Sequence, residues 1–143
     1  MLIALIGESC VGKSTIAAVL KEKLNATVYS GKDYMRLAKS EAEAVQKFKT
    51  LLAQAVNGEN IVYVITEKPH LAFLPEGAKR VVVTADLNTI KTRFAARTNG
   101  VLPSPLAKML EAKHGIFDNE TCLLRIESEK MTPEEAADQI LLM

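Results

Sequence analysis

The residues best suited to chemistry lie near the start of the chain, in the pattern G-x-x-x-x-G-K-S from Gly7 to Ser14. The two glycines let the backbone curl so that successive N–H groups point into one concavity, which suits a phosphate group. Lys13 supplies a positive charge for the outer phosphates, and the hydroxyl of Ser14 is placed to ligate Mg²⁺. The pattern therefore predicts a site for ATP and Mg²⁺ made of Gly7, Glu8, Ser9, Cys10, Val11, Gly12, Lys13, Ser14 and Thr15.

The segments on either side of this pattern fit a strand that runs into a helix. Residues 1–6 (MLIALI) form an unbroken apolar run, as expected for a strand that is buried on both faces. From residue 15 to residue 24, Ile16, Leu20 and Leu24 recur at a spacing of four, which is typical of an amphipathic helix. The alternative is a glycine-rich turn that binds nothing, and the strand–loop–helix context disfavours it.

Two charged residues follow the second expected strand, at residues 26–29. In a parallel sheet this position lies at the same edge as the glycine-rich loop. Asp33 could orient a metal-bound water or accept a proton from an attacking hydroxyl, and Arg36 could grip a phosphate or a carboxylate. A helix N-cap for Asp33 and a solvent-exposed charge for Arg36 are equally compatible with the sequence.

A further carboxylate, Glu67, follows the third expected strand at residues 61–65. Proteins with a phosphate loop often have an acidic residue at the end of a neighbouring strand that holds the Mg²⁺ shell. Glu67 therefore joins Ser14 and Asp33 as a candidate metal ligand. A loop carboxylate paired with Lys68 or exposed to water is the alternative.

Arg93 and Arg97 are four residues apart on an expected helix and so share one face. Two guanidinium groups on one face repel each other unless an anion lies between them. An exposed basic face is the alternative, and the glycine-rich loop upstream favours an anion. We therefore expect both arginines to belong to the nucleotide site.

Strands alternate with helices along the chain. Beyond the first strand and helix, we expect strands at 26–29, 61–65, 80–84 and 121–126 and helices at 33–39, 41–56, 86–97, 105–113 and 133–143. Asp86 and Thr132 are expected N-caps, and Gly58 is expected in the left-handed conformation after the helix at 41–56. Such an order predicts a five-stranded parallel sheet with helices on both faces, a three-layer α/β/α P-loop NTPase fold in one domain. Segments 69–77 and 98–104 are expected loops, the second a lid.

Composition restricts the partners. The net charge is +1 and no basic block exceeds two residues, so nothing favours a nucleic acid. No apolar run approaches the roughly 18 residues of a membrane span, and no charged segment precedes the first strand, so we expect a cytoplasmic protein. Cys10 and Cys122 are expected to be free thiols, with Cys122 in a buried strand. His70 and His114 have no acidic partner at triad or ligand spacing and are expected to be surface or core residues.

Three stretches resemble the small P-loop kinases, the group of nucleoside monophosphate kinases and shikimate kinase. They are residues 7–15 (GESCVGKST), residues 30–36 (SGKDYMR), similar to the T-G-D-x-x-R segment of adenylate kinases, and residues 93–97 (RFAAR), similar to the R-x-x-x-R before the lid. The resemblance implies an adenylate-kinase-like fold with a short lid. It also implies that Arg36 grips an acceptor monophosphate, Arg93 packs on adenine and Arg97 reaches the phosphates.

The chain also departs from these families in the segments that bind the acceptor. The D-G-x-P-R segment of adenylate kinases is absent, and so are the D-x-D and G-G-G segments of shikimate kinase. These departures leave the acceptor open. The phosphate loop and the matching stretches together imply a kinase in which Lys13 and Arg97 neutralise the transferred phosphoryl group and Asp33 assists. A nucleotide or nucleoside is the favoured acceptor. A small non-nucleotide hydroxy compound, or a regulatory ATP-binding module without kinase activity, is the alternative, and the chain is expected to be a monomer or homodimer.

Overall fold

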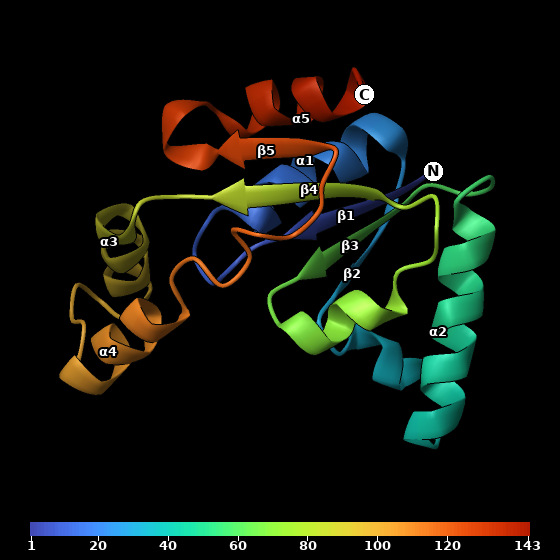
Figure 1. Ribbon diagram of the computed structural model, residues 1–143, viewed down its shortest axis with the longest axis horizontal. Helices are drawn as coiled ribbons and strands as arrows, with labels where there is room; N and C mark the ends of the chain where they lie inside the picture. The colour runs from blue at the N-terminus through green and yellow to red at the C-terminus, as the bar shows by residue number, and fades with distance from the viewer.

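The computed structural model describes residues 1–143 and contains a parallel sheet of five strands between two layers of helices (Figure 1). The strands are β1 (Leu2–Ile6), β2 (Thr27–Ser30), β3 (Ile61–Ile65), β4 (Lys79–Thr84) and β5 (Leu124–Glu127), in the order β2-β3-β1-β4-β5. β1 lies at the centre, and its last residue, Ile6, pairs with Ile65 of β3 and with Val82 of β4. The predicted fold class is confirmed, and the segments after β1, β3 and β4 all leave the sheet at one edge.

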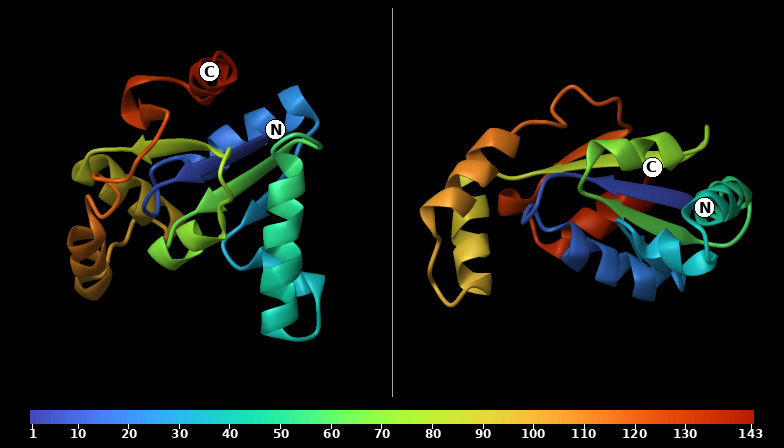
Figure 2. Two further views of the ribbon diagram at one scale, coloured as in Figure 1. Left: turned by 45° about the vertical axis from the view of Figure 1, so that its right-hand side comes forward. Right: turned by 90° about the horizontal axis from the view of Figure 1, so that it is seen from below.

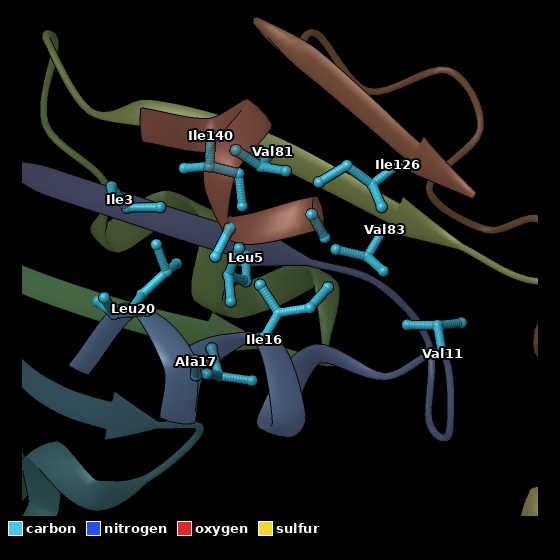
Figure 3. Close-up of a cluster of buried hydrophobic side chains, with 14 of the residues drawn as sticks. Ile3, Leu5, Val11, Ile16, Ala17, Leu20, Val81, Val83, Ile126 and Ile140 are labelled. Atoms are coloured by element: carbon cyan, nitrogen blue, oxygen red, sulfur yellow. The ribbon is translucent and has the colours of Figure 1, made fainter. Parts of the chain in front are cut away.

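One face of the sheet is covered by α1 (Lys13–Leu24) and α5 (Pro133–Leu141). Figure 3 shows Ile16 and Leu20 of α1 among side chains of β1 and β4, with Val11 of the glycine-rich loop at the end of the same cluster. Val11 is 1% exposed, so its burial fixes the loop to this core. The expected capping box at the start of α5 is present, since Thr132 and Glu135 bond to each other's backbone N–H groups.

The opposite face is covered by α2 (Glu41–Ala55) and two short 3₁₀ helices, η1 (Asp33–Leu37) and η2 (Lys68–Phe73). Aromatic rings fill this layer and pack against one another in edge-on, tilted and stacked arrangements. The cluster contains Tyr29, Tyr34, Phe48, Tyr63, His70 and Phe73. It includes all 3 tyrosines of the chain, so the aromatic side chains on this side stabilise the core.

The helices α3 (Leu87–Arg97) and α4 (Ser104–Lys113) project together from the sheet beyond the end of β4 (Figures 1 and 2). We call residues 87–113 the helical arm. Asp86 caps α3 as expected, because its carboxylate accepts a hydrogen bond of 2.8 Å from the backbone N–H of Thr89. The segment that was expected to be a lid, residues 98–104, is the connection between the two helices and the first residue of α4.

Three local expectations are wrong. Gly58 is not left-handed, and a Cβ there would lie 2.7 Å from the carbonyl oxygen of Gln54, so close packing explains the glycine. The expected loop 69–77 begins within η2. Cys122 lies before β5, half-buried and outside the strand, because the pairing of β5 with β4 begins only at Leu124. None of the helices combines the length and apolar character needed to cross a lipid bilayer.

Candidate functional site

The glycine-rich loop joins the buried end of β1 to the start of α1. Its first residue is fixed by the sheet, since the N–H of Gly7 donates to the carbonyl of Ile65 at 3.0 Å. A Cβ at Gly7 would lie 2.5 Å from the carbonyl oxygen of Val83, so only glycine fits there. Gly12 and Cys10 have φ of 99° and 66°, which turns the chain back so that α1 begins at Lys13 with no side-chain cap. The free N–H groups of the first helical turn are therefore available to an anion.

Lys13 lies inside this loop and is only 5% exposed. Its ammonium group donates hydrogen bonds to the backbone carbonyls of Gly7 and Glu8, the second at 2.7 Å. Burial is the main cause that lowers the pKa of Lys13 to about 8; the positive charge of Arg97 contributes a smaller lowering, while Cys10 and Glu8 oppose the shift. Lys13 is thus a cation at neutral pH, and its hydrogen-bond partners are backbone carbonyls and not a carboxylate. Its positive charge is therefore available to interact with a phosphate.

Two cavities adjoin the loop. The larger has a volume of about 400 Å³ and lies between the loop, α3 and the start of α5. Its walls combine the guanidinium groups of Arg93 and Arg97 with the apolar side chains of Met131 and Pro133. Apolar walls beside cationic groups suit a ligand with a planar base and phosphates.

The smaller cavity, of about 160 Å³, lies between the loop and the carboxyl ends of β2 and β3. We call it the polar cavity, because Lys13, Ser14, Ser30, Gly31, Thr66 and Arg97 are among the residues that line it. Arg97 lines both cavities, as do Cys10 and Gly12 of the loop. The structure therefore brings Lys13, Ser14 and Arg97 together, as the sequence predicted.

Arg93 is also brought to the loop, through a partner that sequence reasoning missed. Its guanidinium group donates to the carbonyl of Cys10 at 3.1 Å and to the hydroxyl of Ser128 at 3.0 Å. Ser128 follows β5 in a third 3₁₀ helix, η3 (Ser128–Lys130). Its position directly after the last strand is the one sequence signal that could have identified it. The arginine is thus fixed against the loop instead of pointing into solvent.

Asp33 and Arg36 are brought to each other but not to either cavity. One carboxylate oxygen of Asp33 accepts from the backbone N–H of Ser30 and the other from the guanidinium of Arg36, both at 2.9 Å. The side chain of Arg36 is 80% exposed. Their predicted roles in catalysis and acceptor binding stay predictions, and Ser30 is the residue that connects Asp33 to the lining of the polar cavity.

Glu67 is exposed and lies outside the lining, whereas its neighbour Thr66 faces the polar cavity. Thr66 and Ser30 are further residues that sequence reasoning did not single out. No cluster of three or more His, Cys, Asp or Glu side chains is present to hold a metal. A metal at this site would rest on Ser14, on water and on phosphate oxygens, a set of ligands that suits Mg²⁺.

Comparisons with known proteins establish the fold. Neither a protein family nor a curated protein matches the sequence. Among solved structures, shikimate kinase from Acinetobacter baumannii in complex with shikimate has a TM-score of 0.67 at 17% identity, covering 97% of this chain and 89% of its own. A gluconokinase from Sinorhizobium meliloti has a TM-score of 0.64 at 14% identity, covering 99% and 89%. The Bacillus subtilis YorR protein in complex with phosphorylated GDP has a TM-score of 0.67 at 23% identity, covering 99% of this chain and 94% of its own. The fold is that of the small P-loop kinases.

Proposed function

We propose that the protein transfers the terminal phosphoryl group of Mg-ATP to a hydroxyl group of a small molecule. The observation that carries this proposal is the position of Arg97, which lines both the larger cavity and the polar cavity beside Lys13. Two cavities that share the cationic side chain of Arg97, with a second cation, Lys13, in the polar cavity, suit transfer between two bound substrates. The likeness of the fold to a shikimate kinase and a gluconokinase supports the same assignment.

In this proposal ATP is the donor and lies across the loop. Its adenine occupies the larger cavity beside Arg93 and Met131, and its phosphates lie on residues 7–15. Mg²⁺, held by Ser14 and water, supplies further positive charge to the phosphates. Arg93 is already fixed by Ser128 and the carbonyl of Cys10, so little side-chain freedom is lost when the nucleotide binds.

The transfer itself requires positioning and charge neutralisation. The acceptor oxygen forms a bond to the terminal phosphorus while the bond from that phosphorus to its bridging oxygen breaks, and ADP leaves with the bonding electrons. Lys13 and Arg97 face the cavity where negative charge develops and stabilise it. The hydroxyl proton passes to solvent or to Asp33, which lies outside the lining of the polar cavity but accepts a hydrogen bond from the backbone N–H of Ser30, a lining residue.

Two classes of acceptor are proposed. A nucleotide or nucleoside remains the first, because the exposed guanidinium of Arg36 is accessible to a phosphate from solvent. A small non-nucleotide hydroxy compound is the second, because the polar cavity measures only about 160 Å³ and is lined by the small polar residues Ser30 and Thr66. The aromatic rings on the acceptor side also pack against one another, which favours a compound without a base to stack.

The experiment is a survey of acceptors. The protein is incubated with ATP, Mg²⁺ and, separately, nucleosides, nucleoside monophosphates, hydroxy acids and sugars, and products are identified by mass. A phosphorylated product from one class, absent from Lys13→Ala, supports the kinase and identifies its acceptor class. Saturable ATP binding without any product would favour the regulatory module instead, and absence of ATP binding would contradict both.

A further inference from the structure

We propose that Glu8 and His114 form a clasp that positions the helical arm on the phosphate loop and that favours nucleotide binding when His114 is protonated. The inference rests on the proposed function only in its second part, the binding of nucleotide. Both residues are outside the lining of the two cavities, so their role would be positioning and not contact with substrate.

The contact joins residues that are 106 positions apart in the chain. One carboxylate oxygen of Glu8 lies 2.6 Å from Nδ1 of His114, and the other accepts from the backbone N–H of Gly115 at 2.9 Å. The side chain of Glu8 is only 13% exposed. Both of its oxygens are thus engaged by one turn at the end of α4, where Gly115 adopts a φ of 83°. A carboxylate held on both oxygens has a fixed orientation.

The clasp gives the arm a second attachment to the loop. Arg93 of α3 donates to the carbonyl of Cys10, and His114, which follows the last residue of α4, contacts Glu8. Both helices are therefore attached to the loop, at positions only two residues apart. The backbone carbonyl of Glu8 also accepts a hydrogen bond from Lys13. Loss of the contact between Glu8 and His114 would therefore leave the positions of Arg93 and Arg97 relative to Lys13 less fixed.

The charge of Glu8 gives the clasp its dependence on protonation. A carboxylate in a loop that receives phosphates is unfavourable, and its charge is felt at Lys13, where it opposes the lowering of the pKa. Protonated His114 offsets that charge, whereas neutral His114 leaves it uncompensated. Imidazole side chains change charge between about pH 5 and 8.

Other charged groups surround the pair on each element that it contacts. Asp86, at the start of α3, has its pKa lowered mainly by hydrogen bonds from Thr89, with smaller contributions from the charges of Arg93 and His114. Glu111 and Lys113 precede His114 on α4, and Asp118 lies against the Gly115 turn. Acidic groups on the loop, at the start of α3 and in the following turn thus lie around the pair, and Lys113 is the basic group next to His114 in the chain.

The first test needs no nucleotide. Hydrogen exchange of residues 87–113 is measured in the free protein for wild type, His114→Ala and His114→Gln at pH 6. We expect faster exchange in the arm for His114→Ala and near wild-type exchange for His114→Gln, whose amide can still donate to Glu8. Equal exchange in His114→Ala and wild type would overturn the clasp.

The second test measures the dissociation constant of a non-hydrolysable Mg-ATP analogue by calorimetry between pH 6 and 8. As the pH rises from 6 to 8, we expect the dissociation constant of wild type to increase on the order of fivefold more than that of His114→Gln or Glu8→Gln. This difference is the effect of one partly screened charge. The ionisation of the analogue is common to all variants and cancels in the comparison. Glu41→Gln is the control, since it removes an exposed carboxylate on α2, outside the loop and the helical arm, and it should behave as wild type.

An equal loss of affinity in wild type and His114→Gln would overturn the proton-linked part of the inference. Failure of every variant to bind the analogue at any pH would refute the proposed function. The exchange experiment would still decide whether the clasp exists, so the two failures are distinguishable.

Discussion

Arg97 on α3 and Lys13 at the start of α1 line the same polar cavity, and the charge of the arginine helps to lower the pKa of the lysine. Two positively charged side chains that line the same cavity repel each other in the free protein. A polyphosphate between them would remove that repulsion, so the arrangement favours an anionic ligand over an empty site.

Replacing Lys13 by alanine should strongly reduce phosphoryl transfer while the fold persists. The ammonium group is the cation closest to the loop, and loss of one preorganised charge typically reduces turnover by about 10²- to 10³-fold. Turnover is followed by ADP release, and folding by circular dichroism. Transfer at the wild-type rate in this variant would contradict the proposed role of Lys13.

The pKa of Lys13 also predicts how stability depends on pH. Its folded value of about 8 lies below the ordinary value of 10.5, so between these pH values the unfolded chain binds more protons. The free energy of unfolding should therefore gain a contribution from Lys13 as the pH rises from about 8 to 10.5. Urea unfolding of wild type and Lys13→Met across this range isolates that contribution from other titrating groups. A difference between the two proteins that does not change with pH would contradict the prediction.

Gly7→Ala should displace the phosphate loop. The added methyl group would meet the carbonyl oxygen of Val83 at 2.5 Å and the side chain of Val11 at 2.8 Å, and backbone cannot move aside cheaply. We expect a loss of stability of about 1–3 kcal/mol and a loss of nucleotide binding. Thermal unfolding and calorimetry measure the two effects. Gly100→Asn is the control, since Gly100 is left-handed but has open space around it; nucleotide binding equal to wild type in Gly7→Ala would contradict the prediction.

Thr66→Val should act on the acceptor and not on ATP. It removes a hydroxyl from the polar cavity while it keeps the shape of the side chain. We expect KM for the acceptor to rise by about tenfold, the effect of one lost hydrogen bond, with an unchanged dissociation constant for the ATP analogue. Steady-state kinetics with the acceptor found in the survey measure the change. If KM is unchanged, Thr66 does not contact the acceptor.

Much of the fold follows from local patterns in the sequence. β3 occupies the predicted residues 61–65, because an apolar, β-branched run bounded by polar residues has no competing interpretation. Asp86 and Thr132 cap their helices as predicted, because capping depends on only a few neighbouring residues. The start of β5 differs from the prediction, because its pairing with the distant strand β4 begins only at Leu124, and the expected loop 69–77 begins within the 3₁₀ helix η2.

The site could be predicted only where its residues are close in sequence or carry a recognised pattern. The glycine-rich loop and the Arg93–Arg97 pair meet this condition. The contacts of Glu8 with His114 and of Arg93 with Ser128 join residues 106 and 35 positions apart. Such contacts depend on how the chain crosses between strands, so neither residue type nor spacing could reveal them.

The strand order also determines when the nucleotide site can exist during synthesis. β1 is the first strand made, but its two neighbours in the sheet, β3 and β4, end at Ile65 and Thr84. The loop contacts both strands, because the N–H of Gly7 donates to the carbonyl of Ile65 in β3 and Gly7 lies close to the carbonyl of Val83 in β4. A nascent chain that lacks these residues therefore has its phosphate-loop sequence but no formed loop, and ATP could stabilise the protein only after the central strands have emerged from the ribosome.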